Sequence, residues 1–414
     1  MCSRLTVAFL AASCLTLSSC VYSGSGETSG SRSVIDSVEG GLETATGDSV
    51  AGTDLTARVM HVADSILAGM TLEEKVGQCF MPTIYSRSER RTMRRLMEYL
   101  TDLHVGGVVL LKGDLGSAAR MASVGMSSAI PPFIAIDAEW GLGMRLEDAP
   151  DFPRNGRLGP KADELLLFDY GSEVARECRR VGINMVLGPV VDVSENPRGV
   201  IGSRSFGSDP RRVADLGVAY AKGVESGGVI SVAKHFPGHG SPSGDSHLTL
   251  PVIRRTFHHL DSVDLYPFRA YVSSGLSGVM VGHLAVPAID SLSRPAAVSP
   301  EVICGLLRGT LGFRGLVLTD ALNMAGAGGY GAWEAIIAGA DVVVGPEDTA
   351  REIADVIEKV RSGEIGLDVI DDRCRRILFY KYLMGLDNGR PVRLERLRED
   401  VRGESDSLYR RLLS

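Results

Sequence analysis

The chain contains 414 residues, of which 44% are hydrophobic and 23% are charged. Its formal net charge of −7 argues against a nucleic-acid partner, because proteins that bind nucleic acid present basic surface to the phosphates. One basic run, RSERRTMRR at residues 87–95, mixes its arginines with helix-forming residues. We interpret this run as the solvated face of a helix.

An export signal is predicted at residues 1–19. Arg4 is followed by an apolar run that is too short to span a membrane as a stable helix, and then by small residues. The letters LSSC at residues 17–20 resemble the lipobox of bacterial lipoproteins, which implies cleavage before Cys20 and acylation of that cysteine. An ordinary secretory signal cut nearby is the alternative. We expect an exported protein, periplasmic or on the cell surface, that a lipid on Cys20 anchors to the membrane.

Residues 20–54 are mostly Gly, Ser, Thr and acidic residues, which predicts a flexible tether because they bury too little apolar surface to order themselves. Residues 55–414 contain no second linker, and their length suits one domain if that domain is a barrel-type α/β fold. The cysteines of this part are Cys79, Cys178, Cys304 and Cys374. They are far apart and lack CxxC spacing, so we predict small buried apolar residues rather than a zinc site or a disulfide framework.

Short β-branched runs alternate with longer amphipathic runs, which is the pattern of βα units. Continuous apolar strands flanked by helices, such as those expected at 88–103 and 163–182, indicate a parallel sheet that is buried on both faces. The eight predicted strands are residues 76–84, 105–111, 132–137, 183–193, 229–236, 278–286, 315–321 and 340–346. This number predicts an α/β fold with a single (β/α)8 TIM-type barrel and a C-terminal helical tail at 372–386. An open doubly wound sheet is the alternative, but no GxGxxG follows the first strand.

Polar residues recur at the carboxyl ends of five predicted strands. They are Asp137, Asp192, the pair Lys234 and His235, His283, and Asp320. In a (β/α)8 barrel this end carries the active site, because the eight loops converge there. We therefore expect the active site at the carboxyl ends of these strands.

The stretch KHFPGHGSPSGDSH at residues 234–247 is the richest in functional groups. A metal site could use its histidines and Asp245, but HxH and HExxH spacings are absent and the neighbouring lysine disfavours a cation. A serine hydrolase is disfavoured as well, because the stretch has no GxSxG elbow. We expect neither a metal nor a cofactor.

A glycosidase mechanism uses more of these residues. Asp320 ends a buried strand and would point rigidly into the barrel mouth, which suits a carboxylate that attacks an anomeric carbon. Asp245 and His247 lie two residues apart, so that in an extended segment both side chains share one side. The carboxylate would orient the imidazole, whose ordinary pKa of ~6.5 suits acid–base work near neutral pH. For DSH alone, an Asx-type turn is the alternative.

The order AKHFPGHG and then DSH closely resembles the signature of glycoside hydrolase family 3, in its β-N-acetylglucosaminidase branch. The resemblance extends over roughly residues 70–385 and includes the motifs FIAIDAEWGLGMRL, GPVVDVSENPRGVIGSRSFGSDP and GFRGLVLTDALNM. It aligns Asp320 with the nucleophile of the family. It also implies that the sugar ligands are Asp137, Arg145, Arg204, Lys234 and His235.

The resemblance implies a retaining, exo-acting β-N-acetylhexosaminidase that cleaves terminal β-linked N-acetylglucosamine from cell-wall (peptidoglycan) fragments or other glycans. Asp320 would form a glycosyl-enzyme while His247, paired with Asp245, donates a proton and then activates water. A β-glucosidase of the same family, a phosphorylase that uses phosphate as the acceptor, and a sugar-binding lipoprotein without turnover stay open as alternatives. We expect a carbohydrate as the partner and a monomer as the oligomeric state.

Several of these residues also have structural interpretations. Arg204 could be a salt-bridge partner, His283 part of the barrel wall, His239 a turn stabiliser and Asp192 a cap for the loop after its strand. Trp140 could stack on a sugar or brace its loop. Many relatives carry an Asp directly after PGHG, where this chain has Ser241; the spacing to the DSH segment is kept.

Overall fold

The computed structural model describes residues 47–194, 196, 199–240, 250–389 and 391–414. The predicted signal peptide, Cys20, and the pair Asp245 and His247 lie outside these residues.

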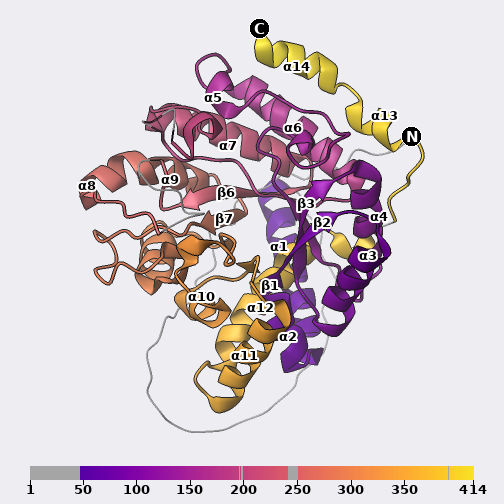
Figure 1. The fold of residues 1–414 in the computed structure, drawn as a ribbon, viewed down its shortest axis with the longest axis vertical. Helices are drawn as coiled ribbons and strands as arrows, with labels where there is room; N and C mark the ends of the chain where they lie inside the picture. Colours follow the sequence, from indigo (N-terminus) through magenta and orange to yellow (C-terminus); the bar gives the residue numbers. More distant parts are fainter. Residues whose placement is uncertain (1–46, 195, 197–198, 241–249, 390) are drawn as a thin grey trace.

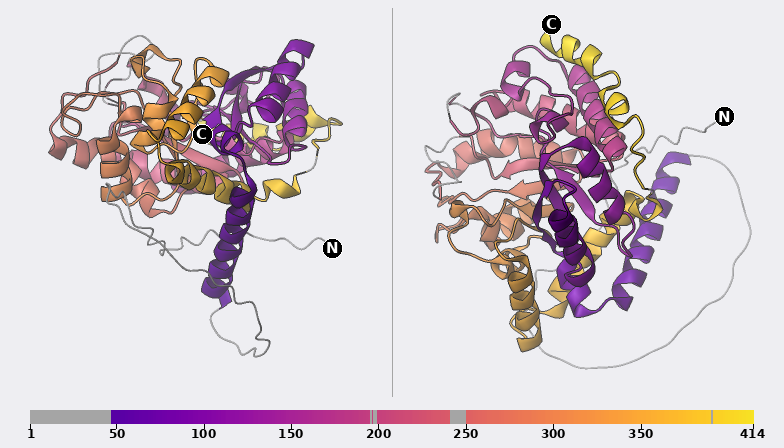
Figure 2. Two further views of the ribbon diagram at one scale, coloured as in Figure 1. Left: turned by 90° about the horizontal axis from the view of Figure 1, so that it is seen from below. Right: turned by 45° about the vertical axis from the view of Figure 1, so that its right-hand side comes forward.

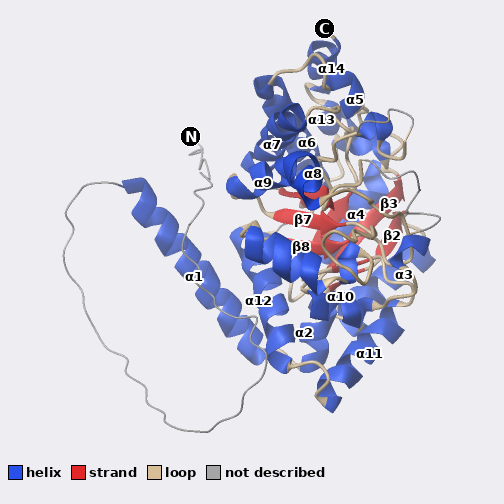
Figure 3. Ribbon diagram, turned by 90° about the vertical axis from the view of Figure 1, so that its left-hand side faces the viewer, coloured by secondary structure: helices blue, strands red, loops and turns tan. Residues whose placement is uncertain are grey.

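A ring of parallel strands forms the centre of the molecule (Figures 1 and 3). Seven strands pair in the order β2–β3–β4–β5–β6–β7–β8, and every pair is parallel. β9 lies beside β8 through a parallel bridge between Leu318 and Val342, and β1 pairs with β9. The strands are β1 (Phe80–Met81), β2 (Thr83–Ser86), β3 (Gly107–Gly113), β4 (Phe133–Ile136), β5 (Met185–Val186), β6 (Ile230–Phe236), β7 (Gly278–Val281), β8 (Leu316–Thr319) and β9 (Val343–Val344).

β1 and β2 are two parts of one barrel strand. Because β1 pairs with β9 and β2 pairs with β3, this strand closes the ring. Pro82 separates β1 from β2, because it has no N–H to donate to the ladder. On one side of the proline the Met81 carbonyl accepts from Gly345, and on the other the Pro82 carbonyl itself accepts from Val109. The prediction of a (β/α)8 barrel is confirmed.

Four predicted strands were wrong in their extents. Of the strands predicted at 278–286 and 340–346, only β7 (Gly278–Val281) and β9 (Val343–Val344) form. Residues 76–78 belong to helix α2 (Leu72–Gln78), which begins with a capping box in which Thr71 and Glu74 exchange hydrogen bonds. This cap fixes the helix in spite of the β-branched Val76. In the predicted strand 183–193 only β5 pairs regularly, because Pro189 interrupts the ladder after Leu187.

Helices surround the ring on its outside (Figure 3). α6 corresponds closely to the helix predicted at 163–182: Asp163 caps its start by accepting from the N–H of Leu166, and Gly182 ends it in the left-handed conformation. The helix predicted at 88–103 is α3 followed by the π-helical turn η1 (Glu98–Asp102), and its arginines are exposed, as expected. The α-helices are α1 (Gly47–Gly69), α2, α3 (Arg90–Met97), α4 (Leu115–Gly125), α5 (Asn155–Leu158), α6 (Glu164–Val181), α7 (Pro210–Ser226), α8 (Phe257–His259), α9 (Leu265–Ser273), α10 (Ala332–Ala338), α11 (Thr349–Ser362), α12 (Leu367–Leu383), α13 (Leu397–Arg402) and α14 (Ser405–Leu413).

α12 contains most of the segment predicted as a tail, but it lies across the amino ends of the strands. Its Lys381 donates to Gln78, the residue two before β1, at 2.7 Å. Its Arg376 pairs with Asp341, which lies just before β9 and is fully buried. The tail beyond it consists of α13 and α14, which lie beside α6 (Figure 1) and are tied to it by contacts such as Ser405 to Glu177 at 2.7 Å.

α1 packs on α12 from the side away from the sheet and projects from the body (Figure 2). A small apolar cluster of Ala63, Leu67, Cys374 and Leu378 joins the two helices. α1 begins at Gly47, inside the range predicted as a tether, because a helix that is held by packing along part of its length propagates into adjoining residues. None of the helices in the described part of the chain is long and apolar enough to cross a membrane.

Lys381 makes the stability of the barrel dependent on pH. Burial lowers the pKa of Lys381 to about 7, whereas the same side chain in the unfolded chain titrates near ~10.4. The unfolded chain therefore binds more protons between these values, so this group makes the free energy of unfolding rise with pH. We predict that the difference in this free energy between wild type and Lys381→Met rises by up to about 1.4 kcal/mol per pH unit from about pH 7 to about pH 10.

Urea unfolding across this range measures the difference. Lys222→Met is the matched control, because Lys222 is exposed on α7. The control should show no such slope. Equal slopes for the two variants would contradict the prediction.

Candidate active site

The loops at the carboxyl ends of β4, β5, β6 and β8 supply the site. Asp137 follows β4, Lys234 and His235 lie near the end of β6, and Asp320 follows β8. One chain of contacts joins all five residues that were predicted to bind sugar, in the order Arg145, Asp137, Lys234, Arg204 and His235, with Glu139 between Lys234 and Arg204.

Asp137 lies between two cations. Its Oδ1 accepts from Lys234 Nζ at 2.8 Å, and its Oδ2 accepts from Arg145 Nη2. Burial alone would raise the pKa of Asp137, but Lys234 and Arg145 outweigh this effect and lower it. The carboxylate therefore stays ionised near neutral pH and keeps lone pairs that can accept from hydroxyl groups of a ligand.

Glu139 is a buried site residue that the sequence analysis missed. Its Oε1 accepts from Lys234 Nζ at 2.9 Å and from Arg204 Nη2 at 2.7 Å. Its Oε2 accepts from Arg204 Nε at 2.9 Å. The available signal was its place two residues after Asp137, in the same loop at the carboxyl end of a strand.

Lys234 is the cation shared by these two carboxylates. Burial opposes its charge, but attraction to Asp137 and Glu139 outweighs burial and raises the pKa of Lys234. Neighbouring residues of a regular strand point to opposite faces. The register between β6 and β7 shifts between Ala233 and Phe236, and Lys234 and His235 both reach the mouth from this irregular end.

Asp192 is fully buried beneath this end of β6 and holds the loop that follows β6 in place. Its carboxylate accepts from the backbone N–H of His235 at 3.2 Å and from that of His239 at 2.6 Å. It also lies 2.8 Å from Nδ1 of His235, which leaves Nε2 of this ring facing Arg204 at 3.4 Å. Asp192 therefore caps the loop and fixes the orientation of the imidazole of His235.

Asp320 has a fixed backbone and a partly exposed side chain. Its N–H donates to Val281 at 2.8 Å, and its Oδ1 accepts from the N–H of Ala321 at 2.8 Å. Burial alone would raise the pKa of Asp320, but His235, His283 and the Ala321 N–H together lower it. The carboxylate is therefore ionised, which its predicted role as a nucleophile requires.

His283 belongs to the wall behind Asp320. It is fully buried, and its Nε2 lies 3.1 Å from the carbonyl oxygen of Ala321. Burial lowers the pKa of His283, so this imidazole is neutral near pH 7.

Trp140 is braced on one face. The guanidinium carbon of Arg154 lies 4.4 Å from the centre of the indole ring, and Arg154 also donates to Ser203 at 3.2 Å. Ser203 precedes Arg204, so this contact ties the loop after β4 to the loop that carries Arg204.

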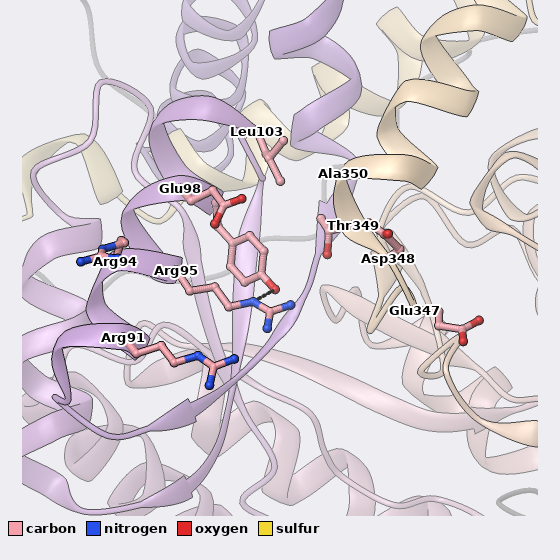
Figure 4. A pocket seen from close by; sticks show the side chains of 10 residues that line it. Arg91, Arg94, Arg95, Glu98, Leu103, Glu347, Asp348, Thr349 and Ala350 are labelled. Atoms are coloured by element: carbon pink, nitrogen blue, oxygen red, sulfur yellow. Dashed lines mark hydrogen bonds between the residues drawn. The ribbon is translucent and has the colours of Figure 1, made fainter.

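A separate hollow of about 430 Å³ lies between η1 and the start of α11 (Figure 4). Three arginines of the basic run line it, namely Arg91, Arg94 and Arg95. Glu98, Glu347 and Asp348 line it too. The arginines remain a solvated helix face.

No group of three His, Cys, Asp or Glu residues within the described ranges is placed to hold a metal ion. Two of the four residues considered for a metal site in the sequence, Asp245 and His247, fall outside those ranges.

The model of the glycosyl hydrolase family 3 N-terminal domain matches residues 71–379. The chain belongs to glycoside hydrolase family 3.

Within family 3, the chain is similar to β-hexosaminidases and β-N-acetylglucosaminidases. A β-hexosaminidase of Nitrosospira multiformis is 36% identical over 256 residues, which make up 58% of this chain and 73% of the relative. A β-N-acetylglucosaminidase/β-glucosidase of Cellulomonas fimi is 31% identical over 360 residues, or 81% of this chain and 63% of the relative. The solved structure of a family 3 β-N-acetylglucosaminidase from Paenibacillus superposes with a TM-score of 0.73 at 32% identity, over 80% of this chain and 68% of that one. The chain is thus a family 3 glycosidase that resembles β-hexosaminidases.

We predict that Asp192→Ala both destabilises this family 3 glycosidase and lowers its activity. The change leaves N–H donors of His235 and His239 unpaired in a buried place, at a cost of about 1–3 kcal/mol each. The free energy of unfolding should fall by at least about 2 kcal/mol, and turnover should fall at least roughly 10-fold, because His235 loses its orientation.

Chemical unfolding and initial rates at a temperature where both proteins are folded measure the two effects. Asp163→Ala, which removes the cap of α6 on the outside of the barrel, is the control. It should cost about 1 kcal/mol and leave turnover unchanged. Normal turnover in Asp192→Ala would show that Asp192 has no part in ordering the site.

Proposed function

We propose that this protein is a retaining, exo-acting β-N-acetylhexosaminidase that removes terminal β-linked N-acetylglucosamine from cell-wall fragments or other glycans. The observation that carries the proposal is the ionised, partly exposed carboxylate of Asp320 at the end of β8, in the mouth that also holds the chain of cations and carboxylates around Lys234. The name of the Paenibacillus protein, a β-N-acetylglucosaminidase, supports the N-acetyl preference, and the name of the Nitrosospira relative supports a β-hexosaminidase.

The reaction would take place in two steps. In the first, an oxygen of Asp320 attacks C1 of the sugar, the bond from C1 to the aglycone oxygen breaks, and a proton from His247 goes to that oxygen. In the second, His247 takes a proton from water as the water oxygen attacks C1, and the bond to Asp320 breaks. Two inversions at C1 give net retention. Asp245 would orient the imidazole of His247.

Asp137, Lys234 and Arg204 would hold the ring. Their charged groups can form paired hydrogen bonds with neighbouring hydroxyl groups, and such bonds strengthen as the ring flattens toward the oxocarbenium-like transition state. Because the bonds among these residues already fix their positions, little reorganisation accompanies the reaction.

A β-glucosidase is the second candidate, and the name of the Cellulomonas relative, which includes both activities, favours testing it. Phosphate as the acceptor in place of water is tested in the same assay.

We predict that wild type hydrolyses p-nitrophenyl N-acetyl-β-glucosaminide faster than the β-glucoside, without loss in EDTA, and that Asp320→Ala lowers kcat by at least roughly 10³-fold. Release of nitrophenol measures the rates, and the released sugar is identified with and without inorganic phosphate. Preference for the glucoside would assign the second candidate. A sugar phosphate as the product would assign a phosphorylase, and loss of activity in EDTA would contradict the metal-free mechanism. Normal activity of Asp320→Ala would contradict the assignment of the nucleophile.

We also propose that Cys20 carries lipid and anchors the protein to a bacterial membrane, which the lipobox-like LSSC segment supports. Cys20→Ser should abolish incorporation of labelled fatty acid into the protein expressed in a bacterial host, because the acceptor thiol is gone. Autoradiography of the purified protein measures this. Equal labelling of wild type and variant would contradict the anchor.

A further inference from the structure

Glu139 lies behind the sugar-binding residues, and its side chain is more buried than that of any of them. Its side chain is 1% exposed, whereas those of Asp137 and Arg204 are 15% and 22% exposed. A ligand in the mouth can therefore reach Asp137 and Arg204 far more readily than it can reach Glu139.

Both oxygens of Glu139 are already engaged by cations. Oε1 accepts from Lys234 and Arg204, and Oε2 accepts from Arg204 alone. The two bonds with Arg204 form a bidentate fork, which fixes the plane of the guanidinium as well as its position. The side-chain hydrogen bonds of Arg204 to other described residues use Nε and Nη2.

Glu139 is unsuited to act as an acid or as a nucleophile. Burial alone would raise the pKa of Glu139, but Lys234 and Arg204 hold it far below its usual value, so the group has no proton to donate. Its burial and its three hydrogen bonds also keep both oxygens from an anomeric carbon.

Without Glu139, the two cations would lose their positions. Lys234 would keep one carboxylate, Asp137, while Arg204 would keep no ion-pair partner among the described residues. A buried cation that loses its carboxylate is strongly destabilised and moves toward water or another anion. Such movement would draw both groups away from the place that Glu139 gives them beside Asp137.

We infer that Glu139 is a positioning residue of the sugar site, which holds Lys234 and Arg204 in place and acts on the substrate only through them. The assay below rests on the proposed glycosidase function.

Glu139→Gln and Glu139→Asp test this role, with Glu147→Gln as the control. Gln keeps the shape but loses the charge, Asp keeps the charge but is one CH₂ shorter, and Glu147 is an exposed carboxylate of the same loop. We predict that kcat/KM falls by roughly 10- to 100-fold in Glu139→Gln and less in Glu139→Asp. The inhibition constant of N-acetylglucosamine should rise in the same order, and the control should match wild type in both.

A double-mutant cycle separates positioning from a purely structural role. If Glu139 acts through Arg204, Glu139→Gln combined with Arg204→Gln should lose less kcat/KM than the product of the two single losses. Losses that multiply, or a Glu139→Gln variant with reduced unfolding free energy but unchanged kcat/KM and inhibition constant, would overturn the inference. If Glu139→Gln does not fold, Glu139→Asp with Arg204→Lys provides the same cycle.

Failure of the proposed function is distinguishable from failure of this inference. A wild type that hydrolyses neither aryl glycoside contradicts the proposed function, and calorimetric titration with N-acetylglucosamine then replaces the rate assay. Weaker binding to Glu139→Gln than to wild type and Glu147→Gln would support the inference. Equal affinities, or no binding to any of the three, would overturn it.

Discussion

The ammonium group of Lys234, held between two buried carboxylates, is the interaction on which the mouth of the barrel depends. A buried charge is stable only if an opposite charge lies in contact with it, and Asp137 and Glu139 provide these partners for Lys234. Each of them pairs in turn with an arginine that is more exposed, Arg145 or Arg204. Charges of alternating sign thus extend from the interior to the surface of the mouth, and the position of each group is fixed by its neighbours.

The barrel makes this arrangement possible because it holds short segments from distant parts of the sequence at fixed separations. Asp137 and Glu139 follow β4, Lys234 lies in β6 and Asp320 follows β8. The loops themselves are held from below, since Asp192 accepts from the backbone of the segment that contains His235 and His239. The rigid strands and capped loops hold the charged groups of the site at fixed positions before a substrate binds. This arrangement agrees with electrostatic preorganisation.

Much of this could be predicted from the sequence, because barrel strands have a local signature. The apolar β-branched runs that end in polar residues predicted the eight barrel strands. They also predicted that Asp137, Lys234 and Asp320 lie at the carboxyl ends of these strands. The extents were less accurate where a local interaction competes with strand propensity, as the capping box at Thr71 does before β1. Glu139 was missed for another reason: its role depends on Arg204, which lies 65 residues away in the sequence, and no local pattern records that contact. The role of α12 was also missed, because an amphipathic helix looks the same whether it trails from a domain or covers one end of it.

The position of α1 determines the end of the barrel at which a partner fused to this helix would be attached. α12 covers the amino ends of the strands and α1 packs on α12, so the two helices lie at the opposite end of the barrel from the polar mouth. A domain or a solid support that is fused directly to α1 would therefore be joined to a helix that packs at this closed end, and the polar mouth lies at the other end of the barrel.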